Sequence, residues 1–387
     1  MRISVDDVLY GTSSDRAGAW THVVEPLAKG SHSWTVNGTS GTFTIDMTAP
    51  TCDVSAVTDL GAVAHLRDAP GRRPTLGEVR GHRSEERVGI MRVAVVGLGS
   101  IARKAYLPVI TSMPDVAPVL VSRTASSLAS IGDAYRVPDR FDSLVAAVES
   151  GLDAALVHTT SQSHPATVAA LLRAGVPVLV DKPLALDLRS AQELVGLATA
   201  TGVSLMVGFN RRYAPAYRAL AGWPDRDVVL LQKHRSHAPG PARQMVFDDF
   251  IHVVDTLRFL VPSTLDDLVT TAHVDDGGSC RRLSVQFTGE RRLAIGVMSW
   301  TAGLSHEVLD VIGDGRRRQV VDLSDVVDLV DGERLTRRDG WISAPEHRGF
   351  VAMCEEFLGA VRDGRILDAS DALVTHEVCE RVVARAL

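Results

Sequence analysis

The sequence MRVAVVGLGSIARKAYLPVI, residues 91–110, decides the fold of this chain. It opens with the apolar run Val93–Val96, which is typical of a buried strand in a parallel sheet. The run breaks into GLGSIA at residues 97–102, a G-x-G-x-x-A pattern between the strand and a helix-compatible segment. This order of strand, glycine-rich turn and helix predicts a site for the pyrophosphate of a dinucleotide.

Five residues of this turn are predicted to bind the cofactor. Gly97 permits the tight turn, Gly99 lets the backbone approach the pyrophosphate, and Ala102 lets the helix pack closely on the strand. Ser100 and Ile101 lie at the start of the helix, where free N–H groups and the helix dipole favour negative charge. The alternative is an ordinary turn between a strand and a helix.

Composition indicates a globular enzyme. The 387 residues, 45% hydrophobic and 23% charged, suit a soluble chain of about two to three domains. A net charge of −6 without a basic patch argues against nucleic acid as a partner. Without a bilayer-length apolar run or a secretory signal, we expect a cytoplasmic protein with no membrane partner. The four scattered cysteines indicate free thiols.

From Met91 onward the sequence alternates between apolar strands and helices. Further strands are predicted at residues 119–121, 154–157, 176–180 and 204–208, which indicates an α/β Rossmann nucleotide-binding domain at 91–210. The rest, 211–387, predicts an α+β domain with a large, mainly antiparallel open sheet for substrate binding and oligomerisation. Its strands are expected at 227–235, 267–275, 281–289, 291–300 and 305–323, before helices near 347–362 and 370–386.

The first ninety residues receive no function from the sequence. Alternating residues with turns at Asn37-Gly38 and Ser40-Gly41 predict strands, so residues 1–66 are expected to form a β-rich appendage of unknown role. Residues 67–90 are rich in Arg, Gly, Pro and Glu, which indicates a linker.

The second strand predicts which dinucleotide is preferred. It ends in Ser122-Arg123-Thr124, where an NAD site usually carries an acid that holds the ribose hydroxyls. A carboxylate would repel a 2′-phosphate, whereas Arg123 can pair with it. We therefore predict that Ser122, Arg123 and Thr124 bind the cofactor and that NADP(H) is favoured. NAD(H) stays possible if Arg123 only covers the adenine.

Polar residues also follow the three later strands of this domain. In an open α/β sheet, ligands lie at the carboxyl ends of the strands. Thr159 and His164 follow the third strand, Asp181 and Lys182 end the fourth, and Asn210 follows the fifth. We predict that all five contact the cofactor.

Three motifs beyond the glycine-rich turn resemble one known family. They are Asp181-Lys182-Pro183, the sequence GFNRRY at residues 208–213, and His252-Val253-Val254-Asp255 with Asp248 before it. Together they resemble the Gfo/Idh/MocA oxidoreductases, and among these the MviM-type proteins, over residues 91–387. The closer likeness rests on GLGSIARKAYLPV, LVDKPLALDLRSAQELV, LMVGFNRRYAPAY, KHRSHAPGP, FDDFIHVVDT and EHRGFV.

The resemblance implies hydride transfer between NAD(P) and a carbinol or carbonyl of a sugar, cyclitol or polyol. It also implies a homo-oligomer formed through the C-terminal sheet. The sequence departs from the family at two places beside the expected nicotinamide. Asp181 replaces the usual Glu, and Thr159-Thr160-Ser161 replaces the usual Thr-Pro-Asn.

Hydride transfer from an alcohol requires a group that takes the hydroxyl proton. Lys182 and His252 are the candidates, and the sequence does not decide between them. Asp248, His252 and Asp255 are spaced four and three residues apart, so they can share a helix face on which a carboxylate orients the imidazole. We predict Lys182, His252 and Asp248 as catalytic residues and no metal. The alternatives are a surface pair of Lys182 with Asp181 and a core role for His252.

Substrate contacts are expected from six residues: Lys182, Arg212, Tyr213, His234, Asp248 and His252. Arg212 and Tyr213 lie at the expected domain junction, where Tyr213 could instead pack between the domains. His234 lies on the first strand of the second domain, between Lys233 and Arg235. Because alternate residues of a strand face opposite ways, His234 and Lys233 cannot easily both line the site.

The main hypothesis is an NAD(P)-dependent oxidoreductase that acts on CH–OH groups of a small molecule. The alternative is a non-catalytic, cofactor-binding regulatory or scaffold protein, because a fold does not determine a function. A further alternative is an enzyme that keeps NAD bound for elimination or hydrolysis. The set of Lys182, Asp248 and His252 favours catalysis.

Overall fold

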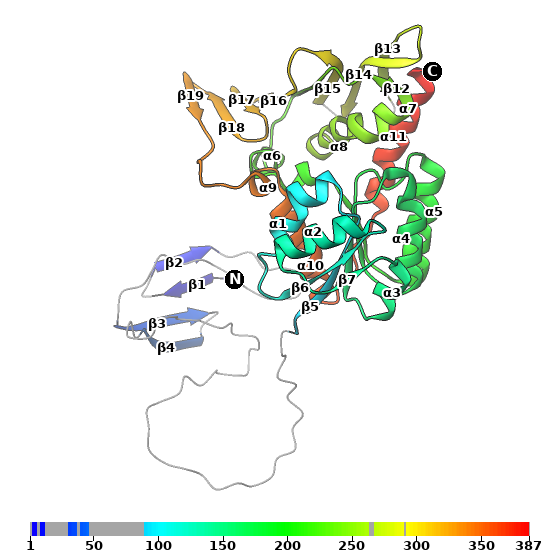
Figure 1. Ribbon diagram of the computed structural model, residues 1–387. Coiled ribbons are helices and arrows are strands. Elements are labelled where there is room, and N and C mark those ends of the chain that lie inside the picture. The colour runs from blue at the N-terminus through cyan, green and yellow to red at the C-terminus, as the bar shows by residue number, and fades with distance from the viewer. Residues whose placement is uncertain are drawn as a thin grey trace. The chain divides into compact units, whose positions relative to one another are not determined.

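The structure is a computed structural model that describes residues 89–262, 267–289 and 292–386, together with the backbone of four strands between residues 2 and 45. The chain divides into two compact units, Met1–Ser84 and Glu85–Leu387 (Figure 1). In the first unit, β1 (Arg2–Val5), β2 (Val8–Gly11), β3 (Gly30–Val36) and β4 (Thr39–Ile45) form an antiparallel sheet in the order β2-β1-β3-β4. The predicted linker at 67–90 lies outside the described residues except for its last two.

The second unit begins with a six-stranded parallel sheet of Rossmann type. Its strands are β5 (Met91–Val96), β6 (Val116–Val121), β7 (Arg140–Phe141), β8 (Ala154–Val157), β9 (Val178–Asp181) and β10 (Leu205–Gly208). Their order is β10-β9-β8-β5-β6-β7, so the strand order reverses between β5 and β8. Ligands of such sheets bind at the carboxyl ends of the strands beside this reversal. The predicted α/β Rossmann fold is therefore confirmed.

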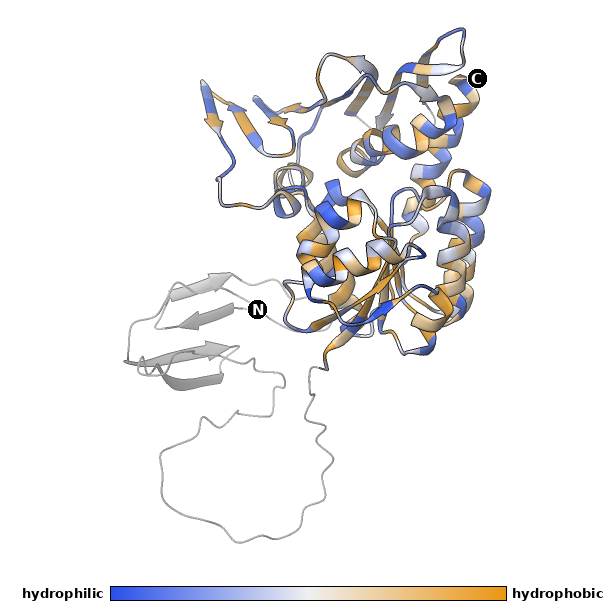
Figure 2. Cartoon of the chain, viewed as in Figure 1, coloured by the Kyte–Doolittle hydropathy of each residue, from blue (hydrophilic) through white to orange (hydrophobic). Residues whose placement is uncertain are grey.

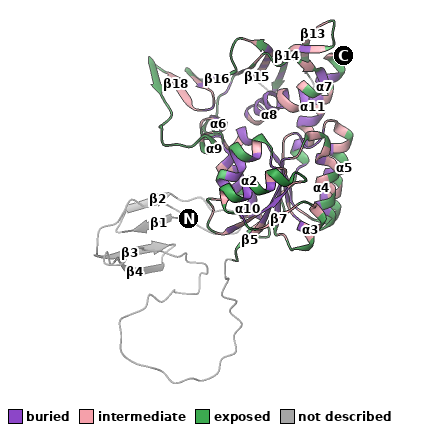
Figure 3. Ribbon diagram, in the orientation of Figure 1, coloured by how far each residue is buried: buried purple, intermediate pink, exposed green. Residues whose placement is uncertain are grey.

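Helices cover both faces of this sheet. The helix after β5 runs from Ser100 to Ile110 and contains a π-helical segment, Ala102–Tyr106, before α1 (Leu107–Ile110). The other helices of this part are α2 (Ala125–Tyr135), α3 (Leu144–Glu149), α4 (His164–Arg173) and α5 (Leu188–Thr201). The strands between them are mainly apolar and buried (Figures 2 and 3).

One face of the parallel sheet is covered by a helix that lies far away in the sequence. Helix α10 (Phe350–Arg362) packs Phe350, Met353 and Phe357 into one cluster with Val93 of β5 and Leu156 of β8. Apolar residues of α4 and α5 cover the opposite face. The nucleotide-binding sheet is thus completed by the C-terminal part of the chain.

The second sheet has nine strands and is mainly antiparallel, as predicted. They are β11 (Val228–Ser236), β12 (Gly240–Pro241), β13 (Val269–Val274), β14 (Ser279–Gly289), β15 (Arg292–Ala302), β16 (His306–Gly313), β17 (Arg316–Val321), β18 (Asp325–Leu329) and β19 (Glu333–Thr336). The order is β12-β14-β15-β11-β16-β17-β18-β19, with β13 paired to β14. The central pair β11–β15 is parallel.

Helix α8 (Ile251–Leu260) packs on the central strands of this second sheet. It contacts β11 and β15, and a Cβ at Gly296 would lie 2.3 Å from Val253 of α8. The remaining helices are Asn210–Tyr213, α6 (Pro215–Ala221), α7 (Ala242–Met245), the π-helical segment Val246–Phe250, α9 (Ala344–His347) and α11 (Ser370–Ala386). Within the described residues, no helix is both long and apolar enough to cross a membrane.

The prediction of a single strand at residues 305–323 is wrong. The structure has two strands there, β16 and β17, joined by a turn at Asp314 and Gly315. Both turn residues have positive φ, 46° and 69°. An Asp-Gly pair with this backbone matches the right-handed twist of the two strands and closes a tight hairpin.

Candidate active site

The glycine-rich turn has the geometry that a dinucleotide requires. Gly97 has a φ of +91°, and a Cβ there would lie 2.8 Å from the backbone nitrogen of Thr159. Gly99 faces open space, with no atom within 4 Å of an ideal Cβ. Helical backbone begins at Ser100, and Ala102 is fully buried beside Val95. The turn therefore leaves room for a pyrophosphate at the start of the helix.

Polar atoms without partners surround the same turn. The hydroxyl of Thr159 and both ring nitrogens of His158 are buried and have no hydrogen-bond partner in the described part of the chain. His158 also contacts the ring of Tyr106, with 3.9 Å between ring centroids. Buried polar atoms normally have partners, so these atoms indicate a place for a ligand. The residues present fit an NAD(P) dinucleotide.

The second strand, β6, is followed by Ser122, Arg123 and Thr124, the residues predicted to bind the cofactor. The hydroxyl of Ser122 accepts a hydrogen bond from the backbone N–H of Thr124 at 3.3 Å. Arg123 is exposed and, within the described ranges, has neither a hydrogen bond nor an ion pair. Because β5 and β6 are parallel neighbours, Arg123 follows β6 at the same end of the sheet as the glycine-rich turn.

His164 is placed differently from our expectation. Its ring is 1% exposed, with Nδ1 2.7 Å from the carbonyl of Pro183 and Nε2 3.1 Å from that of Thr159. Burial lowers the pKa of His164, although both carbonyl contacts act in the opposite direction. The buried ring connects the segment after β8 with the segment after β9. This geometry supports a positioning role more than a cofactor contact.

Asp181 and Lys182 lie at the end of β9. The hydroxyl of Tyr106 donates a hydrogen bond to Asp181 at 2.9 Å. Burial raises the pKa of Asp181, while Lys182 and this hydrogen bond act to lower it. The peptide bond between Lys182 and Pro183 is cis. Asp181 is therefore engaged with the helix after β5, and the lysine extends towards the second sheet.

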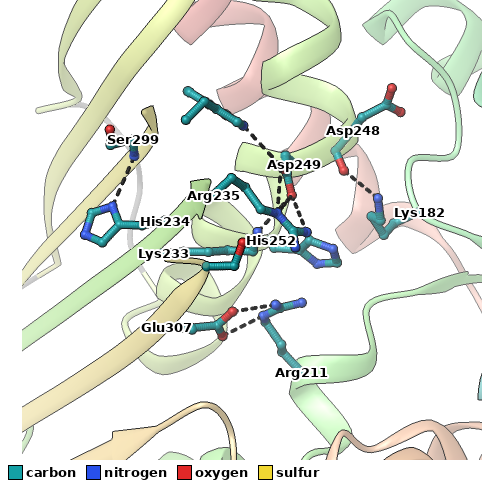
Figure 4. A network of polar contacts seen from close by, with 12 residues as sticks. Lys182, Arg211, Lys233, His234, Arg235, Asp248, Asp249, His252, Ser299 and Glu307 are labelled. Carbon is teal, nitrogen blue, oxygen red and sulfur yellow. Dashed lines mark hydrogen bonds and ion pairs between the residues drawn. The ribbon is translucent and has the colours of Figure 1, made fainter. Parts of the chain in front are cut away.

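Two hydrogen bonds connect the parallel sheet to the segment before α8. Lys182 Nζ donates to the backbone carbonyl of Asp248 at 2.5 Å (Figure 4). The hydroxyl of Ser161 donates to the Asp248 carboxylate at 2.7 Å. The first bond does not use the carboxylate of Asp248. The structure thus brings Lys182 and Asp248 together, although not as an ion pair.

His252 lies next to these groups on α8. It is 8% exposed, and among the described residues its ring has no hydrogen bond. Its pKa is lowered well below the ordinary value, first by burial and then by the positive charges of Arg211, Lys182, Lys233 and Arg235. The ring is therefore neutral at physiological pH and able to accept a proton or a hydrogen bond.

The expectation of a carboxylate beside the imidazole is wrong. Asp248 binds Ser161, and Asp255 forms a bidentate pair with Arg212, so neither carboxylate orients the ring of His252. The helix before His252 is π-helical from Val246 to Phe250. A π-helical turn contains an additional residue, which rotates Asp248 away from the face expected from α-helical spacing.

Charged side chains from the second sheet complete the site. Asp249 accepts bonds from Lys233 at 2.8 Å, from Arg235 at 2.9 Å and from the indole N–H of Trp300 at 3.1 Å. Arg211 forms a buried bidentate pair with Glu307, at 2.9 and 2.6 Å (Figure 4). Burial lowers the pKa of Lys233 to about 8 in spite of Asp249.

The three residues predicted after β10 are engaged elsewhere. Asn210 donates to the carbonyl of Arg348 at 2.8 Å, and Arg212 binds Asp255 and Asp371. Tyr213 is half-buried beside the α10 cluster, and this burial raises the pKa of its hydroxyl. These contacts fit structural roles at the junction with the C-terminal helices.

His234 is directed away from the group around His252. Its ring accepts a hydrogen bond from the backbone of Ser299 at 3.2 Å and lies on the other face of the sheet (Figure 4). The neighbours Lys233 and Arg235 face α8 instead. The choice of His234 as a substrate contact is therefore not supported within one chain.

Sequence reasoning missed several residues of the site. Ser161, Asp249 and Glu307 were not selected as site residues, although Ser161 belongs to Thr159-Thr160-Ser161 and Asp249 to FDDFIHVVDT. Lys233 and Arg235 had a usable signal, because Val229 and Leu231 precede them at a spacing of two and are both buried. That periodicity assigns Lys233 and Arg235 to the covered face and His234 to the other one.

A parallel sheet with a pyrophosphate-fitting turn, next to a lysine and a neutral histidine, defines the class of dinucleotide-dependent oxidoreductases. Residues 91–209 match a family described as "Oxidoreductase family, NAD-binding Rossmann fold" (Gfo/Idh/MocA), and residues 215–328 match "YceM-like, C-terminal domain". The chain belongs to the Gfo/Idh/MocA family. It is thus an NAD(P)-dependent oxidoreductase of the kind that acts on CH–OH groups.

Several known proteins are similar to this chain. YceM of Salmonella typhimurium, an oxidoreductase by name, is 34% identical over 297 residues, which span 75% of this chain and 96% of YceM. Myo-inositol dehydrogenase Hyg17 of Streptomyces leeuwenhoekii is 34% identical over 44% of this chain and 55% of its own length. A Gfo/Idh/MocA family oxidoreductase from Vibrio cholerae has a TM-score of 0.71 at 29% identity, over 76% of this chain and 99% of that chain.

Proposed function

We propose that this protein transfers a hydride between NADP(H) and a carbinol or carbonyl carbon of a sugar, cyclitol or polyol. One observation carries the proposal. Lys182, at the carboxyl end of β9, and the neutral His252 of α8 lie close together beside the cofactor edge of the parallel sheet. The inositol dehydrogenases among the relatives support the substrate class.

Each chain residue has a role in this proposal. The turn at residues 97–102 holds the pyrophosphate, and Arg123 pairs with the 2′-phosphate. The nicotinamide, when bound, accepts or supplies the hydride. Lys182 donates a hydrogen bond to the substrate oxygen, and His252 accepts the hydroxyl proton or returns it. Ser161 and Tyr106 position Asp248 and Asp181 around the lysine.

The domain limits and the assembly are part of the same proposal. Residues 91–210 serve as the nucleotide-binding domain and 211–387 as the substrate-binding and oligomerisation domain. Half-buried apolar residues on the face of the sheet opposite α8, among them Leu293, Ile295 and Val297, support a homo-oligomer formed through that face. We expect this assembly in the cytoplasm.

A titration of the purified full chain with NADPH and NADH tests the proposal first. After a check for bound nucleotide, calorimetry and fluorescence are expected to give exchangeable binding with NADPH at least about tenfold tighter, since one charge-assisted contact is worth about 1.5–3 kcal/mol. Equal affinities would remove the NADP(H) preference. A copurifying nucleotide that does not exchange would instead favour the mechanism in which the cofactor stays bound, and no binding would contradict the proposal.

A further inference from the structure

The cations around His252 outnumber the carboxylates that face them. Arg211, Lys182, Lys233 and Arg235 are the charges that act most strongly on the ring, and all are positive. They come from different parts of the chain: the end of β9, the turn after β10, and β11. A concentration of one charge in a partly buried site requires a counter-charge or costs stability.

Two of the cations share a single carboxylate. Asp249 is the partner of both Lys233 and Arg235, and it also accepts the indole N–H of Trp300. Lys233 is 3% exposed, and its pKa of about 8 reflects the difficulty of keeping a charge there. Arg235 is 44% exposed, so its guanidinium can reach a ligand without leaving its place on β11. One positive charge is left over in this trio.

The remaining charges of the site do not supply the missing anion. Arg211 and Glu307 form an ion pair with each other, and Glu307 also accepts a hydrogen bond from the hydroxyl of Tyr217 at 3.0 Å. Asp181, the last residue of β9, directly precedes Lys182 and offsets that charge. Asp248 turns its carboxylate towards Ser161, away from the cations (Figure 4). The excess charge therefore stays at Lys233 and Arg235.

We propose that the substrate of this enzyme is a sugar or polyol that carries a carboxylate, bound by Arg235 and Lys233 while Lys182 and His252 contact the reacting oxygen. The planar fork of Arg235 fits two carboxylate oxygens. One unit of excess charge matches a carboxylate better than a phosphate, which carries about −1.5 to −2 at neutral pH. This inference rests on the proposed hydride transfer and specifies its substrate.

Three sugars that differ at one carbon test the inference: D-glucose, D-glucuronate and D-glucose 6-phosphate. We expect calorimetry on the full chain with saturating NADP⁺ to show D-glucuronate binding at least about tenfold tighter than D-glucose, and tighter than the phosphate, the worth of one charge-assisted pair. Glycolate and ethylene glycol form a second pair without stereochemistry, and glycolate is expected to bind more tightly. Preference for the neutral members of both pairs, or for the phosphate, would overturn the inference.

Variants at Arg235 separate this site from general effects. Arg235→Gln leaves Asp249 with Lys233 alone, so we expect the preference for D-glucuronate over D-glucose to disappear. Arg235→Lys keeps the charge and is expected to keep most of the preference. Arg189→Gln, at an exposed position of α5 that pairs only with Glu193 among the described residues, is the matched control. A preference that survives in Arg235→Gln would exclude Arg235 as the carboxylate contact and overturn the inference.

The same samples distinguish this inference from the proposed function. An NADPH titration of each variant reports cofactor binding independently of any carboxylate. Failure to bind NADPH would contradict the oxidoreductase proposal, whereas intact NADPH binding with no carboxylate preference would contradict only the substrate class.

Discussion

At the scale of single residues, the site depends on a lysine that connects the two sheets. Lys182 ends β9, and its ammonium donates to the carbonyl of Asp248 on the segment before α8. The adjacent Asp181 is held by the hydroxyl of Tyr106. The ammonium is thereby held beside the end of β9, and we propose that its other N–H groups contact the substrate oxygen.

Lys182→Ala is expected to lower kcat by about 10²–10⁴-fold, the usual contribution of a proton-transferring or hydrogen-bonding group. NADPH affinity should stay close to that of the wild type, because the glycine-rich turn and Arg123 are untouched. Steady-state kinetics and NADPH titration measure the two effects. Lys104→Ala, which removes an exposed lysine from the helix after β5, is the control. Full turnover in Lys182→Ala would show that the lysine is not catalytic.

Arg123→Ala tests the preference for the phosphorylated dinucleotide. We expect the Kd for NADPH to rise by about 10–100-fold, because one charge-assisted contact with the 2′-phosphate is lost. The Kd for NADH should change little. Arg189→Ala removes an equally exposed guanidinium from α5 and serves as the control. Equal losses for both nucleotides would mean that Arg123 only covers the adenine.

At the scale of elements, the position of α8 decides where His252 lies. A Cβ at Gly296 would lie 2.3 Å from Val253 and 2.8 Å from Leu257, so the helix contacts β15 without any intervening side chain. This close contact between α8 and β15 places His252 near Lys233 and Arg235, the cations of β11. Small changes at this contact are therefore expected to move His252, the proposed proton acceptor.

Gly296→Ala is expected to destabilise the protein by about 1–3 kcal/mol, because the added methyl group overpacks the contact with α8. Turnover should fall as well, since His252 moves with the helix. Denaturant unfolding and kinetics measure the two effects. Gly196→Ala, on exposed α5 with nothing within 4 Å of its Cβ, is the control and should be stabilising by about 0.5–1 kcal/mol. Unchanged stability in Gly296→Ala would mean that α8 is free to adjust.

Regular elements could be predicted from the sequence where their spacing follows one rule. The apolar runs of β5 and β8 and the glycine-rich turn are local signals, and they correctly predicted the parallel sheet. The π-helical segment Val246–Phe250 has no comparable signal, so the face assigned to Asp248 was wrong. The Asp314-Gly315 pair is a turn signal within residues 305–323, but that range was interpreted as one continuous strand.

The candidate site was harder to predict than the fold because its members meet only in space. Lys182 and His252 were selected from motifs, and the structure brings them together. Glu307 binds Arg211 from a strand ninety-six residues away, a pairing that no local pattern could indicate. Asn210 and Arg212 are polar like binding residues, yet the structure uses them at the junction with the last helices.

At the scale of the whole molecule, the enzyme is contained in the second compact unit. Residues 85–387 form that unit, and both family matches begin at or after residue 91. We expect a chain without residues 1–90 to keep its NADPH affinity and the midpoint of its thermal unfolding. Differential scanning calorimetry and nucleotide titration check this. A shortened chain that does not fold would show that the first ninety residues support the enzyme.

The return of α10 to the first sheet has a consequence for synthesis. During translation β5 and β8 leave the ribosome long before Phe350 and Phe357, which cover them. Until the ribosome has passed α10, the nascent chain presents the apolar face of those strands to water and to chaperones. The parallel sheet is therefore synthesised early, but its core is completed only after α10 has been synthesised.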